Sequence, residues 1–253
     1  MARYPASGMS YAFGPGPLSP AIRLLIVANI GMFLLSMLVP EIVLRLGLSP
    51  SAVFGRLAIW QPVTYLFLHG GIGHILFNML ALWMFGTELE RMWGTRFFTK
   101  FYFVSGVGAA ATTLLWSLSP LPYADMLYYT STIGASGAIY GVLLAYAVSF
   151  PNRLIYLYFV FPIPAKYFVM IIGAIAFLSS MGSGGGGVAH TAHLGGMVVA
   201  YFYLKGPRAR PLDELRYRWY RWRMNRARGK FDVYSGGRRR DDDWKSDWKK
   251  HIH

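Results

Sequence analysis

The chain of 253 residues is too apolar and too poor in charge to be an ordinary soluble domain. Hydrophobic residues make up 55% of it and charged residues 14%, against about 45–50% and about 25% in typical soluble domains. The charge is also uneven, because residues 205–253 hold 16 Lys or Arg and 7 Asp or Glu, and the first 204 residues hold only 13 charged residues. Cysteine is absent, which excludes disulfides and thiolate metal sites. Such a long, weakly charged stretch predicts a membrane protein.

Six apolar segments of about 20 residues predict an all-α polytopic membrane protein. Residues 1–20 are interpreted as a cytoplasmic disordered leader, because they lack the apolar core of a signal peptide. The connection 40–70 is too interrupted by proline and glycine to span a membrane, and the segment 154–164 either leads into the fifth span or lies along the membrane interface. The predicted core covers 21–204, with expected spans at 21–39, 71–89, 97–117, 131–149, 165–181 and 188–204.

The distribution of Lys and Arg predicts which side of the membrane each connection faces. One side carries Arg45 and Arg56 alone, whereas the other side carries all the remaining cations. Both termini are therefore expected in the cytoplasm, which agrees with an even number of spans. The inner membrane of a bacterium is the expected location.

The predicted tail, residues 205–253, opens with Trp and Tyr interleaved with Arg in the run LDELRYRWYRWRMNRARGK. A basic aromatic segment that follows a final span typically binds the cytoplasmic leaflet, so anionic lipid is its expected partner. Binding of nucleic acid is the weaker alternative, and the preferred interpretation is that the chain binds none.

Polar residues inside apolar spans are costly, so each needs a structural or a functional reason. His74 and Asn78 are four residues apart and lie on one face of the second helix. They are either hydrogen-bonding groups between helices or two donors aimed at one oxygen. Ser136 lies in the fourth span among glycines, a pattern that more often indicates close helix packing than a nucleophile.

Small residues predict how the fourth and sixth helices pack. Each helix has a face of small residues with a four-residue repeat, which allows another helix to approach closely: Gly137 and Gly141 on one, and Ala192, Gly196 and Ala200 on the other. If the two faces meet, His193 lies beside Ser136. Tyr140, one turn from Ser136, then packs on whatever partners that serine.

The polar groups are also expected at one depth in the membrane. With the first loop outside, the second, fourth and sixth spans run in the same direction. His74, Ser136 and His193 each fall a few residues past the start of a span, or about 5–8 Å below the outer boundary at about 1.5 Å per residue. This arrangement predicts an active site that is open to water from the outside.

At these residues the chain resembles the rhomboid family of intramembrane serine proteases. The resemblance rests on WQPVTYLFLHGGIGHILFNM at 60–79, GASGAIYG at 134–141 and AHLGG at 192–196, in the family's order. It implies a rhomboid-like bundle of six transmembrane helices that hydrolyses peptide bonds in or near transmembrane segments. The implied substrates are single-pass transmembrane proteins, and neither a cofactor nor a metal is implied.

The resemblance also implies roles for individual residues. Ser136 is the implied nucleophile and His193 the implied general base, a dyad without a carboxylate. His74, Asn78 and the backbone N–H of Ser136 are the implied oxyanion hole. Tyr140 matches the family's aromatic residue that stacks on the catalytic histidine. Three glycines are expected to support this site by close packing: Gly134, Gly137 and Gly196.

Two other functions stay open at this point. One is a non-catalytic, rhomboid-like factor that binds membrane proteins on the same scaffold. The other is a metal-dependent membrane hydrolase or a metal transporter that uses His69, His74, His190 and His193. The chain has no His-Glu-x-x-His motif and no carboxylate beside these histidines in the spans to complete a zinc site, so the metal hypothesis is the weaker one.

Overall fold

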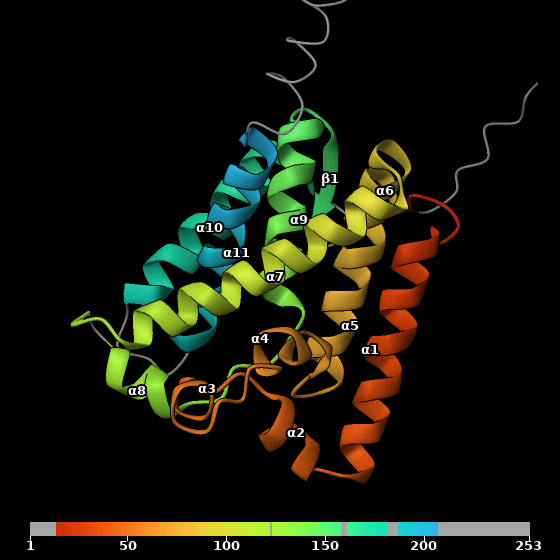
Figure 1. The fold of residues 1–253 in the computed structure, drawn as a ribbon. Helices are drawn as coiled ribbons and strands as arrows, with labels where there is room; N and C mark the ends of the chain where they lie inside the picture. The colour runs from red at the N-terminus through yellow and green to blue at the C-terminus, as the bar shows by residue number, and fades with distance from the viewer. Residues whose placement is uncertain (1–13, 122, 158–160, 182–186, 207–253) are drawn as a thin grey trace, which may run out of the picture. The chain divides into compact units, whose positions relative to one another are not determined.

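The computed structural model of the chain (Figure 1) describes residues 14–121, 123–157, 161–181 and 187–206. Residues 1–13 of the predicted leader and the part of the tail after Gly206, with its predicted binding of anionic lipid, lie outside the described residues. The described part is mainly helical, in this order: α1 (Pro20–Leu38), α2 (Glu41–Leu46), α3 (Pro50–Arg56), α4 (Gln61–Thr64), η1 (Tyr65–Phe67), α5 (Ile72–Ala81), η2 (Leu82–Gly86), α6 (Thr87–Trp93), α7 (Thr95–Ser117), α8 (Ala124–Tyr129), α9 (Ser136–Ser149), β1 (Leu154–Leu157), β2 (Phe161–Pro164), α10 (Ala165–Met181) and α11 (Gly187–Lys205).

Each predicted span contains a helix, with boundaries that shift by at most five residues. The second span is a continuous helix because η2, a π-helical turn, joins α5 to α6. By length and hydropathy, two helices of the described part are long and apolar enough to cross a membrane: Pro20–Leu38 and Ile72–Trp93. A mainly helical fold is therefore confirmed, and the number of six spans stays a prediction.

Within residues 14–206, α11 packs against α7, α9 and α10. Figure 1 shows α7 crossing α9 and α11 at an angle, with α1 at the edge beside α5 and α6. The connection after α1 folds into short helices, and α3 and α4 each have a proline in the first turn, where its missing N–H costs nothing. Segment 154–164 pairs with itself, because β1 and β2 are antiparallel with Leu154 opposite Pro164.

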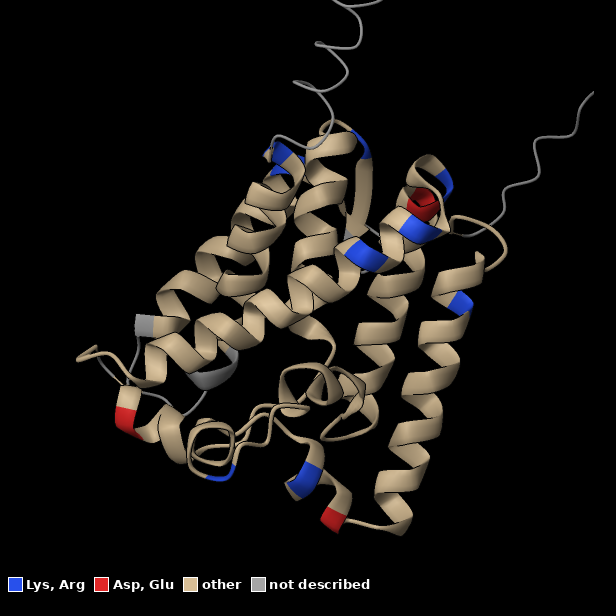
Figure 2. Ribbon diagram, viewed as in Figure 1, with Lys and Arg blue, Asp and Glu red and all other residues tan. Residues whose placement is uncertain are grey.

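Charged residues lie toward the ends of the helices and leave their middles uncharged (Figure 2). Arg45 on α2 and Arg56 on α3 belong to the connection after α1. Arg91, Arg96 and Lys100 belong to the other end, around the connection between α6 and α7. The two groups of cations that the sequence separates are therefore on different connections at opposite ends of the helices.

The helix of the fourth predicted span, α9, begins at Ser136, five residues later than predicted. The residues before it are extended, because Thr132 and Leu48 exchange two backbone hydrogen bonds of 2.8 and 2.9 Å, and the N–H of Gly134 donates to the carbonyl of Tyr65 at 2.9 Å. Gly134 has a φ of +125°, which favours glycine. Backbone partners from distant parts of the chain thus replace the helical hydrogen bonds, and Ser136 lies at the helix N-terminus.

A buried carboxylate on α6 caps the start of α1. Glu90 is 2% exposed and accepts hydrogen bonds from the N–H groups of Ala21 (2.9 Å) and Ile22 (3.1 Å) and from the Ser19 hydroxyl. The hydroxyl of Thr95 also donates to it at 2.7 Å. The first N–H groups of a helix have no partner within the helix, so Glu90 supplies the acceptors that α1 itself lacks.

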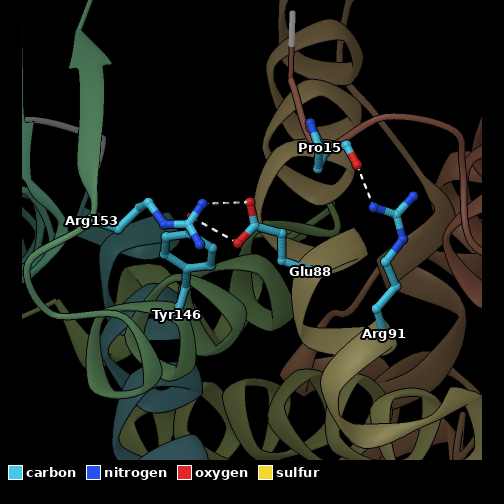
Figure 3. A network of polar contacts seen from close by, with 5 residues as sticks. All are labelled: Pro15, Glu88, Arg91, Tyr146 and Arg153. Atoms are coloured by element: carbon cyan, nitrogen blue, oxygen red, sulfur yellow. Dashed lines mark hydrogen bonds and ion pairs between the residues drawn. The ribbon is translucent and has the colours of Figure 1, made fainter. Parts of the chain in front are cut away.

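The described part of the predicted leader is bound to the bundle rather than disordered. The guanidinium of Arg91 donates to the carbonyls of Pro15 and Pro17, and the first of these bonds is drawn in Figure 3. The indole N–H of Trp83 donates to the carbonyl of Gly16 at 3.1 Å. Side chains of η2 and α6 therefore hold residues 15–17.

A second acidic residue on α6 connects to the end of α9 (Figure 3). Glu88 accepts a hydrogen bond from the hydroxyl of Tyr146 at 3.4 Å and forms an ion pair with Arg153, also at 3.4 Å. The Arg153 side chain is 53% exposed, so water screens this pair and reduces its contribution to stability.

We expect Glu90→Gln to lower the free energy of unfolding by about 1–3 kcal/mol, because the new amide N–H group would face buried donors that need an acceptor. Glu88→Gln on the same helix is the matched control and should cost less than about 1 kcal/mol, since its ion-pair partner Arg153 is exposed and a Gln amide oxygen can still accept the hydrogen bond from Tyr146. Thermal unfolding in detergent measures both variants. Equal losses in the two variants would contradict the assigned role of Glu90.

Candidate active site

Ser136 and His193 come from different helices and meet through a short contact. The hydroxyl oxygen of Ser136, at the start of α9, lies 2.7 Å from Nε2 of His193 on α11. The ring of Tyr140 stacks on the His193 ring with a centroid separation of 4.1 Å and an angle of 5° between the planes. Nδ1 of His193 is buried and has no hydrogen-bond partner among the described residues. Packing, rather than a described carboxylate, therefore orients the imidazole.

Close approach of α9 and α11 makes this contact possible. A Cβ added to Gly196 would lie 1.9 Å from the carbonyl oxygen of Gly137, a distance that no side chain can occupy. A Cβ on Gly141 would lie 3.1 Å from Cβ of Ala200, and one on Gly137 would lie 2.7 Å from Cβ of Ala109 on α7. The two faces of small residues meet as expected, and α7 packs on the same glycines.

His74 on α5 lies beside the same serine. The N–H of Gly70 donates to Nδ1 of His74 at 3.4 Å, which assigns the ring hydrogen to Nε2 when the ring is neutral. A Cβ added to Gly134 would lie 2.8 Å from this Nε2 and 3.6 Å from the Ser136 hydroxyl oxygen. The absence of a side chain at Gly134 therefore leaves the space between a ring N–H donor and the serine hydroxyl open.

Asn78 lies one helical turn after His74 and is buried. Its amide nitrogen donates to the carbonyl of His74 at 2.8 Å, which fixes the position of the side chain. An amide nitrogen carries two hydrogens, so this bond uses one N–H and leaves the second for another acceptor.

These polar side chains line a single cavity of about 440 Å³. A volume of this size lies within the range of about 300–1,000 Å³ that is typical of ligand sites. The walls are mostly apolar, and the polar groups come from α5, α9 and α11, as this list of lining residues shows: Gly73, His74, Phe77, Asn78, Ala81, Ile133, Ser136, Ile139, Tyr140, Leu143 and His193.

Tyr65 positions the segment before Ser136, and the sequence analysis assigned it no role. It is 1% exposed, its hydroxyl donates to the carbonyl of Gly106 at 2.7 Å, and its own carbonyl accepts the N–H of Gly134. The only signal in the sequence is its place in the motif that contains His69 and His74. Tyr65 thus connects α7 to the extended segment that leads into α9.

The two remaining histidines of interest lie outside the cavity lining. His69 is buried, with its ring 5.0 Å from that of His74 and edge-on to it. His190 is half-buried, with its ring 5.6 Å from that of His193. In the described part of the chain, no three His, Asp or Glu side chains are grouped so that they could hold a metal ion.

Comparison with known families matches residues 56–206 to the family described as Rhomboid domain. The mitochondrial rhomboid protein 1 of Saccharomyces cerevisiae is 35% identical over 138 residues, which cover 54% of this chain and 38% of the yeast protein. Rhomboid protease GluP of Bacillus subtilis is 31% identical over 163 residues, which cover 64% of this chain and 29% of GluP. Rhomboid protease AarA of Providencia stuartii is 29% identical over 157 residues, which cover 55% of this chain and 53% of AarA.

The matched segments span less than two thirds of the length of each of these relatives. The family match covers more than half of this chain. It contains every residue that lines the cavity around Ser136, so the similarity to the family includes the whole candidate site.

The contact between α9 and α11 predicts the effect of adding one methyl group to Gly196. We expect Gly196→Ala to lower the free energy of unfolding by about 1–3 kcal/mol through overpacking against the Gly137 carbonyl. The matched control is Gly31→Ala in α1, because a Cβ there meets nothing within 4 Å. Thermal unfolding of both variants in detergent tests this. A Gly196→Ala protein as stable as the Gly31→Ala protein would show that the helices are farther apart.

Proposed function

Because the chain belongs to the rhomboid family, we propose that it is an intramembrane serine protease that cleaves membrane proteins in or near their transmembrane segments. The observation that carries the proposal is the 2.7 Å contact between the Ser136 hydroxyl and His193 Nε2. Two of the relatives, GluP and AarA, are named rhomboid proteases, which supports the same activity.

The proposal includes six membrane-spanning helices, namely α1, the continuous helix from α5 to α6, α7, α9, α10 and α11. Helix α9 has 14 residues, or about 21 Å of helix, which is shorter than the hydrocarbon core of about 30 Å. The extended segment before α9 then lies at membrane depth, where its backbone bonds to Leu48 and Tyr65 supply the partners that lipid cannot. The loop with Arg45 and Arg56 faces outward and both termini face the cytoplasm. A bacterial inner membrane stays a prediction.

In the first chemical step, Nε2 of His193 accepts the proton of the Ser136 hydroxyl as the oxygen attacks a substrate carbonyl. The tetrahedral intermediate collapses when His193 returns this proton to the leaving amine. The substrate is then joined to Ser136 as an ester, and water activated by His193 hydrolyses it. An imidazole held by stacking on Tyr140 serves this purpose without a buried carboxylate, which would be costly in a membrane.

Three donors are proposed to stabilise the oxyanion of the tetrahedral intermediate. They are the backbone N–H of Ser136, the second amide N–H of Asn78 and Nε2–H of His74. The N–H of Ser136 belongs to the first turn of α9, where backbone N–H groups lack partners within the helix. Loss of one such donor typically costs about 2.7–4 kcal/mol of transition-state stabilisation.

The proposed substrates are single-pass transmembrane proteins. A transmembrane helix satisfies its backbone hydrogen bonds internally, so a scissile carbonyl must leave the helix before Ser136 can attack it. The cavity of about 440 Å³ is suited to a short extended stretch of substrate rather than an intact helix, whose diameter is about 10–12 Å. Helix-weakening Gly, Ser or Pro near the cleavage site should therefore favour hydrolysis.

A fluorophosphonate probe tests whether Ser136 is the nucleophile. We expect covalent labelling of the wild-type protein at Ser136, with no labelling and no cleavage of a single-span substrate by Ser136→Ala. Ser149→Ala, at the other end of the same helix, is the matched control and should retain both. Full cleavage by purified Ser136→Ala would favour another nucleophile, whereas absence of cleavage and labelling in folded wild-type protein would favour the non-catalytic alternative.

The two histidines of α11 provide a second test. His193→Ala should lose about 10²–10⁴-fold in turnover, because the serine would lack its base. His190→Ala removes a ring that lies outside the cavity lining and should stay within about 10-fold of wild-type turnover, well short of the loss that removing a catalytic base causes. Cleavage rates at matched concentrations of folded protein are compared. A larger loss in His190→Ala than in His193→Ala would reverse the assignment.

A further inference from the structure

A second cavity lies at the end of the bundle that carries α2, α3 and α8 (Figure 1), and it shares no lining residue with the cavity around Ser136. Its volume is about 570 Å³. Its walls come from residues 44–61 of the connection between α1 and α5, together with Tyr129 and Ser131. The proposed peptidase chemistry does not use this cavity.

Two cations line this cavity without a described counter-ion. Arg45 and Arg56 are the only Lys or Arg between residues 24 and 90, and both belong to the lining. The lining contains no Asp or Glu. In the described part of the chain, the only ion pair joins Arg153 to Glu88. Neither Arg45 nor Arg56 is therefore neutralised by a described carboxylate. The cavity therefore has a net positive charge and favours an anion.

The wall around these cations is held in place independently of their side chains. The carbonyl of Arg45 accepts hydrogen bonds from the indole N–H of Trp60 (3.0 Å) and from the amide of Gln61 (3.3 Å). Gln61 is 2% exposed, and its oxygen accepts the N–H of Ser49 at 3.0 Å. The hydroxyls of Ser49 and Ser51 lie 2.9 Å apart at the same wall. Guanidinium and hydroxyl groups are the donors that phosphate oxygens bind.

Large apolar side chains at this end of the bundle indicate what carries the anion. Leu44, Leu57 and Ile59 are 76%, 72% and 77% exposed. Leu44 belongs to the lining of the cavity, and Leu57 and Ile59 alternate in sequence with other residues of the lining. Trp60 and Tyr129 belong to the lining and are also exposed. Exposed aliphatic side chains beside Arg, Trp and Tyr are typical of a segment in the membrane interface. A ligand at this depth has both an acyl chain and a polar head.

We propose that this cavity binds the phosphate group of an anionic membrane phospholipid such as phosphatidylglycerol. The guanidinium groups of Arg45 and Arg56 donate to the phosphate oxygens, and Leu44, Leu57 and Ile59 contact the acyl chains. A free phosphate ion offers the same oxygens but has no chain for the apolar residues to contact. The site uses neither Ser136 nor His193, so it stands or fails independently of the peptidase.

A photoreactive phosphatidylglycerol with its diazirine near the glycerol tests the site directly. The full-length protein in uncharged detergent is cross-linked and digested, and adducts on residues 44–61 are counted by mass spectrometry, which separates this cavity from the basic tail. We expect Arg45→Gln/Arg56→Gln to reduce these adducts by about 10-fold or more, because charge-assisted hydrogen bonds to phosphate are lost. Arg96→Gln, an exposed arginine on α7, is the control and should leave them unchanged.

Competition identifies the source of the phosphate. Unlabelled phosphatidylglycerol should displace the probe, and an equal concentration of inorganic phosphate should not. Displacement by inorganic phosphate at that concentration would overturn the assignment to lipid. Equal adduct yields from the double variant and the wild type would overturn the site itself, as would an equal loss in Arg96→Gln.

Folding of the variants is checked by their thermal unfolding midpoints without lipid. These should match that of the wild type, because the hydrogen bonds of Trp60 and Gln61 reach the backbone of Arg45 rather than its side chain. Arg45→Lys/Arg56→Lys keeps both charges and should retain more adducts than the Gln variant. Labelling of the tail serves as an internal control and should be the same in the Gln variant as in the wild type. If it is, and if the Lys variant loses as many adducts on residues 44–61 as the Gln variant does, then binding requires the fixed geometry of the guanidinium groups rather than charge alone.

Discussion

The position of the candidate site depends on the contact between the backbones of α9 and α11. At Gly196 and Gly137 the two helices are so close that a methyl group would meet a carbonyl oxygen at 1.9 Å. Helices in lipid gain little from the hydrophobic effect, so small residues that allow close packing are a main source of their association. The same contact sets the distance between Ser136, one residue before Gly137, and His193, three residues before Gly196. A displacement of about 1 Å at such a site can cost about 100-fold in rate.

A second constraint acts on the segment that precedes Ser136. Its backbone N–H and C=O groups need hydrogen-bond partners that a helix does not supply here. Those partners are the backbones of Leu48 and Tyr65, which come from the connection after α1. Gly134 takes a positive φ at this point and leaves room for the ring of His74. The connection between α1 and α5 therefore belongs to the support of the site, although none of its residues from 40 to 68 lines the cavity.

Local sequence signals predicted the side chains at the site better than the backbone around them. Spacings of three to four residues place His74 with Asn78 and align Gly196 with its neighbours, because the helical repeat alone determines these faces. The start of α9 was predicted five residues too early, since an apolar composition does not reveal hydrogen bonds to Leu48 and Tyr65, which lie far away in the sequence. The cap that Glu90 provides for α1 was missed for the same reason, because its partner Ala21 is 69 residues away.

The order of the helices along the chain has a consequence for biosynthesis. Ser136 begins α9, whereas His193 lies on α11, the last described helix, and α10 separates the two. When α9 has entered the membrane during synthesis and α11 has not, Ser136 is therefore present without His193, its proposed base. With the dyad as proposed, a nascent chain stays inert while its earlier helices insert beside other newly made membrane proteins. Proteolytic competence then arises only when α11 docks against α9, so insertion of α11 acts as the activating event.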